Sequence, residues 1–394
     1  MSVADVLVVG AGPAGSAAAA SLAARGWRVI LADRAVFPRS KPCGDYCNPG
    51  AVETLRSLDL LPALERSGAG SIDGMTVVGQ DGSTMRGRFP SGRGALLRRE
   101  TLDMLLLRRA EQKGAHLVER FRADEISVAD SVEVRDTLSG RALRARLLIA
   151  ADGMRSAVAR RLGLLRGLPD GRFTAGAYFS GVSGPPEGEL HLGDGLYGGV
   201  ARFGDGTANV CLALPRTLYR GRSAAEAFAL GLRGLPVLGE TVSGWRPLSP
   251  FRVTGPIGFA RRAVSAAGVL LAGDAAGQVE PLTGQGIAAA LRSGLDAAEE
   301  AHRALETGDL SAISLHRYDR RRAAAFGPSV RMMKVVTALA LRPGLTPLLL
   351  RRLSTRPGLS RRLLGAAGNV LDPDAILSPG FAVRLLLGFD AHQA

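Results

Sequence analysis

A glycine-rich turn near the start of the chain constrains its fold more than any other feature. Gly10, Gly12 and Gly15 follow an apolar run at residues 6–9 and precede an alanine-rich stretch at residues 16–24. This order predicts a strand, a tight turn and a helix, in which glycines let the backbone approach a phosphate and let the helix pack on the strand. The free N–H groups at the helix N-terminus are suited to a nucleotide pyrophosphate.

A second strand, predicted at residues 27–32, ends at Asp33. An acid at this distance from the glycine turn is typical of a residue that accepts a hydrogen bond from a ribose hydroxyl. The alternative is a glycine turn that serves packing alone. The strand before the turn, the helix after it and the acid together favour nucleotide binding.

Two further strand ends carry a short carboxylate. Residues 147–150 form an apolar run followed by Asp152 and Gly153, and residues 269–272 form another that is followed by Gly273 and Asp274. A carboxylate at such a place can accept a hydrogen bond from a ribityl hydroxyl. Residues 284–287, at the start of a predicted helix, offer backbone N–H groups to the edge of a flavin ring.

With these three motifs in order, spanning nearly residues 1–310, the chain resembles the FAD-dependent p-hydroxybenzoate-hydroxylase-like flavoproteins. The resemblance implies FAD as cofactor and NAD(P)H as reductant. It implies pyrophosphate contacts from Gly10, Gly12, Pro13, Ala14 and Gly15, ribose contacts from Asp33 and Arg34, and an adenine contact from Ala123. It also implies contacts to the flavin and its side chain from Arg99, Asp152, Gly153, Gly273, Asp274, Pro281, Gly284, Gly286 and Ile287.

Two stretches are similar to the geranylgeranyl-reductase-like branch of this family. They are residues 41–45, with Cys43, Gly44 and Asp45 as expected flavin contacts, and residues 283–287. The proline-punctuated helical tail also fits that branch. One departure is the strand at residues 197–203, which lacks the tryptophan of the aromatic Y-x-W-x-F-P signature found in the prenyl reductases. This departure argues against a prenyl substrate.

Cys43 and Tyr46 are the catalytic candidates. We expect the neighbouring basic residues of the loop to lower the pKa of the Cys43 thiol, which would contact substrate or donate a proton. The alternative is a small apolar filler in a loop that covers the flavin. Cys47, Tyr178, Tyr197 and Arg202 are candidate substrate contacts, each with a structural role as its alternative. No cysteine or histidine spacing suggests a metal site.

The predicted fold class is α/β: a Rossmann-like FAD-binding domain of the GR2 type, an inserted antiparallel-sheet substrate domain and a helical C-terminal segment. The FAD-binding domain is discontinuous and comprises residues 1–72, 98–171 and 266–310. Residues 73–97 and 172–265 form the substrate domain. Residues 311–394 form helical pieces that Pro328 and later prolines are expected to separate.

Composition limits the setting and the partners. The net charge is +14, yet no nucleic-acid module accompanies it, so we expect no nucleic acid as partner. Neither a signal peptide nor a long uncharged apolar run is found, and we expect a cytoplasmic protein. The tail interleaves arginines with leucines, which would suit a peripheral contact with an anionic membrane. Helices that cap the substrate pocket with a solvated arginine face are the favoured alternative. The oligomeric state is left open.

These features favour an FAD-dependent oxidoreductase, with an NAD(P)H- and O₂-dependent monooxygenase as the first hypothesis. It would hydroxylate or epoxidise a bulky apolar small molecule, such as a polyketide or terpenoid of specialised metabolism, including antibiotic biosynthesis. The second hypothesis, favoured by the Cys43 loop, is reduction of isolated C=C bonds in a prenyl lipid. A third is a flavoprotein whose FAD is structural and undergoes no net redox turnover.

Overall fold

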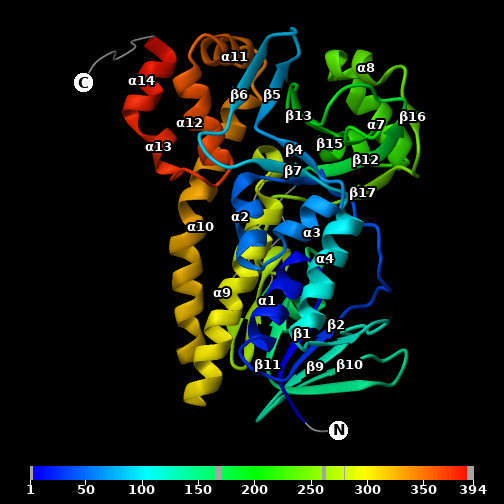
Figure 1. Cartoon of the computed structure of the whole chain (residues 1–394), viewed down its shortest axis with the longest axis vertical. Helices are drawn as coiled ribbons and strands as arrows, with labels where there is room; N and C mark the ends of the chain where they lie inside the picture. Colours follow the sequence, from blue (N-terminus) through cyan, green and yellow to red (C-terminus); the bar gives the residue numbers. More distant parts are fainter. Residues whose placement is uncertain (1–2, 165–170, 260–262, 279, 388–394) are drawn as a thin grey trace.

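The computed structural model of the chain describes residues 3–164, 171–259, 263–278 and 280–387, and a mostly parallel sheet forms its first layer (Figure 1). The parallel strands lie in the order β19 (Val269–Leu271), β11 (Ala142–Ala150), β1 (Ala4–Val9), β2 (Val29–Ala32) and β8 (His116–Val118). Antiparallel strands extend the sheet, with β18 (Ser265–Ala266) beside β19 and with β10 (Val132–Arg135) and β9 (Glu125–Val128) beyond β11. The central strands are apolar and buried, as a parallel sheet covered on both faces requires.

Helix α1 (Pro13–Ala23), which begins just after β1, packs against both α4 (Arg99–Gln112) and α9 (Gly286–Thr307). Gly294 of α9 lies so close to α1 that a Cβ atom there would stand 2.1 Å from the carbonyl oxygen of Ala14. One residue earlier, the hydroxyl of Ser293 accepts a hydrogen bond from the N–H of Gly273 at 2.8 Å. The close crossing therefore brings the Gly273 turn and the start of α1 to one place. Shorter helices α2 (Pro49–Ser57), α3 (Leu61–Arg66) and α5 (Ala157–Arg161) complete this part of the molecule.

The second large sheet is antiparallel except for one pair. Its order is β16 (Arg246–Pro247), β12 (Phe173–Ser180), β15 (Thr207–Leu214), β14 (Tyr197–Arg202), β13 (Glu187–Leu192), β5 (Gly74–Gly79) and β6 (Thr84–Arg88), with β17 (Arg252–Thr254) also on β12. Helices α6 (Arg216–Tyr219), α7 (Ala224–Arg233) and α8 (Pro236–Val242) pack near one face around Phe179 and Phe228. A small sheet of β3 (Tyr46–Cys47), β7 (Gly94–Leu96) and β4 (Gly70–Ile72) is separate from both.

The predicted fold class is confirmed, and several elements lie within a few residues of their predicted positions. The strand predicted at residues 27–32 is β2, the apolar runs at residues 147–150 and 269–272 are the end of β11 and β19, and the helix predicted to start at residues 284–287 is α9. The hairpin β5–β6, from the earlier of the two insertions, pairs with β13 of the later insertion, so both contribute to one sheet. Residues 94–96 of the earlier insertion instead form β7 of the small sheet.

The tail comprises α10 (Ala312–Ala340), α11 (Thr346–Ser354), α12 (Pro357–Ala367), α13 (Asp374–Leu377) and α14 (Pro379–Leu387), and the last residues of the predicted segment, 388–394, lie outside the described part. The prediction that Pro328 separates two helices was wrong, because α10 continues through it. Proline removes one helical hydrogen bond at a cost of about 3 kcal/mol. Burial of Tyr318 on one side of Pro328 and of Met332 and Met333 on the other anchors both halves of the helix.

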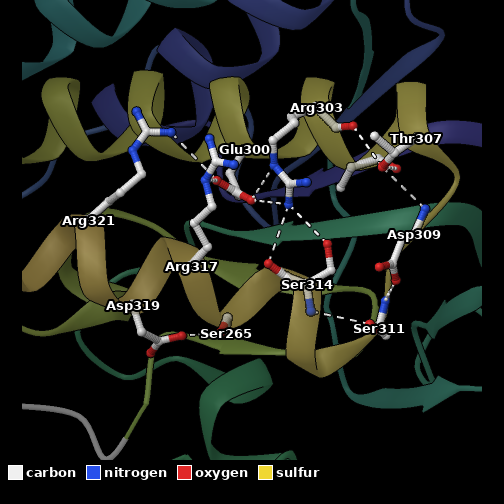
Figure 2. A network of polar contacts seen from close by, with 11 residues as sticks. Ser265, Glu300, Arg303, Thr307, Asp309, Ser311, Ser314, Arg317, Asp319 and Arg321 are labelled. Atoms are coloured by element: carbon white, nitrogen blue, oxygen red, sulfur yellow. Dashed lines mark hydrogen bonds and ion pairs between the residues drawn. The ribbon is translucent and has the colours of Figure 1, made fainter.

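A buried carboxylate anchors α10 to α9 (Figure 2). Glu300 of α9 is fully buried and pairs with Arg303 at 2.5 Å, while Arg321 of α10 approaches it to 3.6 Å. Farther along the same seam, Asp319 accepts hydrogen bonds from the Ser265 hydroxyl and from the Val264 N–H. These contacts fix the start of the tail on the first sheet. Within the described ranges, no helix combines the length and the apolar composition that crossing a bilayer requires.

Candidate flavin and substrate site

A cavity of about 540 Å³ lies where the first sheet, the second sheet and the tail helices meet. Its wall is mostly apolar and continuous from the glycine turn of α1 to helices α10–α14. The predicted site residues in this wall are Gly12, Pro13, Ala14, Cys43, Gly44, Tyr46, Arg99, Gly153, Tyr197, Gly273, Asp274, Pro281, Gly284, Gly286 and Ile287. Residues far apart in the sequence therefore form one chamber with a nucleotide end and an apolar end.

In the glycine turn, Gly12 lines the cavity, whereas Gly10 and Gly15 lie outside its wall and are required by the packing of the turn itself. Gly10 has φ +102°, and a Cβ atom there would stand 2.3 Å from the carbonyl oxygen of Ala151. A Cβ atom on Gly15 would overlap the carbonyl oxygen of Gly10 at 1.8 Å. Gly12 caps α1 without a side chain, so the first N–H groups of that helix are available to an anion.

Basic side chains surround this turn. A guanidinium nitrogen of Arg39 stands 3.4 Å from where a Cβ of Gly12 would be. Lys41 lines the cavity, and its charge interacts with those of Arg39, Arg99, Asp103 and Asp274. Burial, reinforced by Arg99, lowers the pKa of Lys41 below its ordinary value.

Three cations thus face two carboxylates, one of which, Asp103, is already bound by Arg99 at 3.0 Å and by Arg39 at 3.1 Å. The surplus of positive charge beside free helix N–H groups suits a pyrophosphate, so these residues fit FAD. Asp274, in the same wall, is placed to meet a polar part of the cofactor.

Tyr46 of β3 lines the cavity and packs against the turn that opens α9. Gly284 adopts a left-handed conformation with φ +70°, and a Cβ atom there would stand 2.5 Å from the ring of Tyr46. Glycine is therefore required at this contact. Burial raises the pKa of Tyr46 well above its ordinary range, which keeps the hydroxyl protonated at neutral pH.

Cys43 also lines the cavity, but the expected direction of its pKa shift was wrong. Burial raises the pKa of the thiol, and the opposing effect of the nearby Arg99 guanidinium is smaller. Removing water from around a thiolate costs more free energy than the attraction to the Arg99 guanidinium regains, because Arg99 is already paired with Asp103. The thiol is therefore neutral at pH 7 and can hold a proton for transfer.

Asp45 is not in the cavity wall and joins the Cys43 loop to the second sheet. Its carboxylate accepts hydrogen bonds from the Tyr178 hydroxyl at 2.6 Å, from the Asn209 side-chain amide at 2.7 Å and from the Arg99 N–H at 3.2 Å. Asn209 also donates to the carbonyl oxygen of Cys43 at 2.7 Å. Burial raises the pKa of Asp45 to about 6. Asp45 and Tyr178 were predicted to contact the flavin and the substrate. In the structure they form hydrogen bonds that hold the Cys43 loop against the second sheet, outside the cavity wall.

The other predicted substrate contacts are divided. Tyr197 lines the cavity, and its hydroxyl donates to Glu280 at 2.6 Å. Arg202 lies outside the wall, pairs with Glu189 at 2.7 Å and stacks over the ring of Trp245. Cys47 is fully buried in a separate apolar cluster with α2 and α4.

The remaining predicted cofactor contacts lie outside the cavity wall. The carboxylate of Asp33 accepts a hydrogen bond from the N–H of Ala11 at 2.8 Å, Arg34 is exposed and Ala123 is half-buried. Asp152 accepts a hydrogen bond from the N–H of Ala157 at 2.7 Å, at the start of α5. Its second oxygen is buried and has no hydrogen-bond partner among the described residues, so a cofactor hydroxyl would satisfy it.

Sequence reasoning treated Arg39 and Lys41 only as the basic residues near Cys43, not as cofactor contacts, and gave Asn209 no role. Lys41 carried a signal because it belongs to the recognised stretch at residues 41–45, and Arg39 lies just before it; Asn209 carried none. Sequence reasoning also did not identify which tail residues line the apolar end of the cavity. The tail residues in the wall include Val335, Val336, Leu339, Leu349, Leu350, Leu353, Leu377, Phe381, Ala382 and Leu385.

Comparisons with known proteins agree with this geometry. A family model described as an FAD binding domain matches residues 3–177. Menaquinone reductase of Mycobacterium tuberculosis (strain ATCC 25618 / H37Rv) is 32% identical over 369 residues, which cover 88% of this chain and 88% of the reductase. Digeranylgeranylglycerophospholipid reductase 1 of Methanothermobacter thermautotrophicus is 30% identical over 332 residues, which cover 80% of this chain and 81% of that enzyme.

Among solved structures, a flavoprotein/dehydrogenase from Cytophaga hutchinsonii has the same fold, with a TM-score of 0.84 at 19% identity. The match covers 98% of this chain and 100% of the Cytophaga hutchinsonii chain. The chain therefore belongs to the p-hydroxybenzoate-hydroxylase-like flavoproteins, in their geranylgeranyl-reductase-like branch, and is an FAD-dependent oxidoreductase.

Proposed function

We propose that this protein reduces C=C bonds in the prenyl chain of a lipid, with FAD as the hydride carrier and NAD(P)H as its reductant. The observation that carries the proposal is the continuous, mostly apolar cavity that extends from the cofactor end to the tail helices. A flexible hydrocarbon chain fills such a space and leaves few polar groups unsatisfied. The names of the two reductase relatives support the same reaction class.

The reaction adds two hydrogens across the double bond. FAD, when reduced, supplies a hydride to one carbon, and a proton must reach the other. Cys43 holds a proton on its Sγ atom at the cofactor end of the cavity, because burial keeps the thiol neutral. The C=C π bond, the S–H bond of Cys43 and the bond that held the hydride on reduced FAD would break, two C–H bonds would form, FAD would be left oxidised, and the thiolate would recover its proton from water.

The mass of the product tests this proposal. The holoprotein is reduced under nitrogen with NADPH or NADH and incubated in detergent with a geranylgeranyl lipid, which has no quinone ring that could take up the two hydrogens. We expect a product heavier by two hydrogen atoms, formed without oxygen. A product heavier by one oxygen atom, formed only in air, would refute the reductase and support oxygenation.

Oxygenation is the second candidate, and one feature of β14 favours it. Tyr197, Gly199 and Val200 line the cavity where the prenyl reductases carry the aromatic signature with tryptophan. Gly199, where a Cβ atom would come no closer to its neighbours than 4.0 Å from the carbonyl oxygen of Cys211, leaves room for a bulkier, less linear substrate than a prenyl chain. Consumption of one O₂ for each NAD(P)H, coupled to product, is the result this candidate requires.

A further inference from the structure

Helices α10, α11 and α14 surround an opening of the cavity. Val335, Leu339 and Ala382 each line the cavity and are also exposed at the surface. A residue can do both only at a rim, so the cavity opens between the carboxyl-terminal half of α10 and α14. Figure 1 shows α11–α14 gathered around that half of α10 at one end of the molecule.

The surface around this rim is apolar. Leu348 of α11 is 45% exposed and Val383 of α14 is 46% exposed, although neither lines the cavity. Val335 and Leu339 are exposed by 46% and 36% and stand one helical turn apart. Helix α14 packs on α11, so these side chains belong to neighbouring elements. Large aliphatic groups exposed together at a cavity rim mark an interaction surface.

The segment from the end of α10 to α14 is strongly basic. Residues 331–387 contain nine arginines and lysines but only two acidic residues, Asp372 and Asp374. Asp374 pairs with Arg331 at 3.3 Å. Lys334 of α10 and Arg342, in the connection from α10 to α11, are exposed, and neither has an ion-pair partner within the part of the chain that the structure describes. This surface therefore presents unneutralised positive charge beside exposed aliphatic side chains.

We propose that the α10–α11–α14 face binds the surface of an anionic lipid bilayer, with the aliphatic rim inserted and the basic residues at the phosphate level. Aliphatic groups flanked by cations match the order of a bilayer interface, whereas a protein partner would need acidic groups to meet these cations. The bilayer would then lie against the cavity opening, so that a lipid tail enters without crossing water. The role in substrate entry rests on the proposed function, and the binding does not.

Sedimentation with vesicles tests the binding directly. The full FAD-loaded protein is mixed with vesicles of phosphatidylcholine alone or with added phosphatidylglycerol, and the bound fraction is measured. We expect at least tenfold tighter binding to the anionic vesicles and loss of most of it at high salt. Equal binding to both vesicle types, or no binding, would overturn the proposal.

Substitutions identify the face. Leu348→Asp combined with Val383→Asp should weaken binding at least tenfold, because carboxylates would replace the inserted aliphatic groups. Ile313→Asp is the matched control: Ile313 is 90% exposed on the same helix α10 but lies about 39 Å from Leu339 along it. Thermal unfolding and FAD content show that both variants are folded. Equal binding by the two variants would refute this face.

The design separates this proposal from the proposed function. Vesicle binding needs no turnover. If the protein binds anionic vesicles but reduces no C=C bond, the membrane-binding proposal stands and the proposed reductase activity is refuted. If gel filtration shows a dimer that the double variant dissociates, with no vesicle binding, the face pairs with a second copy and the proposal fails. With detergent-dissolved lipid, the double variant should keep its turnover within about twofold.

Discussion

At the residue scale, two side chains of the Cys43 loop have different tasks. Cys43 faces the cavity with a neutral thiol, whereas Asp45 faces the second sheet and holds the loop through Tyr178 and Asn209. Asn209 bonds both Asp45 and the carbonyl oxygen of Cys43, so the position of the thiol depends on the second sheet. Proton donation and loop placement can therefore be separated by mutation.

Cys43→Ala should lower kcat about a hundredfold while FAD stays bound, because a positioned acid contributes roughly that factor to proton transfer. Cys211→Ala is the control: Cys211 lines the same cavity, and burial raises its pKa to about 12, but it lies on β15 outside the loop. Steady-state rates and flavin absorbance check both variants. Equal rates for the two variants would make Cys43 a filler.

Asp45 should make the protein less stable as the pH rises from about 4 to 6. Its folded pKa of about 6 lies above the ordinary 3.8, so between these values the folded state binds more protons than the unfolded state. The stability from its protonated form is present below the ordinary pKa and lost as the pH passes the folded one. The shift corresponds to about 3 kcal/mol. Asp45→Asn should flatten Tm against pH in this window, and an unchanged slope would contradict the assignment.

At the scale of elements, the carboxyl end of α12 is tied to the flavin end of the molecule. The Gln285 side chain, next to the start of α9, donates to the carbonyl oxygens of Ala366 at 3.0 Å and Ala367 at 3.2 Å. Asn48, at the start of α2, donates to Ala367 at 3.1 Å. The apolar tail and the turn predicted to meet the flavin ring are therefore held as one unit.

Gln285→Leu should lower the free energy of unfolding by about 1–2 kcal/mol, because a buried amide and its acceptors lose their bonds. It should also weaken FAD binding several-fold, since the α9 turn loses its support. Gln112→Leu, at the exposed end of α4, is the control and should change neither property. Thermal unfolding and flavin release measure the two effects, and matching values in both variants would exclude the coupling.

At the scale of the whole molecule, the first sheet, the second sheet and the tail helices all line the cavity, so we expect FAD binding to stabilise the folded chain. FAD at a hundredfold excess over its Kd should stabilise the folded state by about 2.7 kcal/mol. Asp274→Ala should abolish most of this gain, whereas Asp309→Ala, on the exposed connection between α9 and α10, should retain it. Thermal shift with and without FAD checks this, and a full shift in Asp274→Ala would remove that residue from the cofactor site.

Much of this architecture was predictable because it is local. Glycine spacing located the turn of α1, and the apolar runs at residues 147–150 and 269–272 located the end of β11 and β19. The hydrogen bonds to Asp45 were not predictable, because its partners Tyr178 and Asn209 lie 133 and 164 positions away in the sequence. The predicted direction of the Cys43 pKa shift was wrong for a related reason: a sequence shows which residues are charged, but it does not show how deeply a thiol is buried. The continuity of α10 through Pro328 likewise depends on packing on both of its sides.

Anaerobic reoxidation of the bound flavin tests C=C reduction most directly. Reduced protein is mixed in a stopped-flow instrument, without oxygen, with an unsaturated prenyl lipid or with its fully saturated counterpart. We expect the absorbance of oxidised flavin to return at a rate that rises with the concentration of the unsaturated lipid and to stay flat with the saturated one. Flavin that remains reduced with both lipids until oxygen is admitted would contradict it.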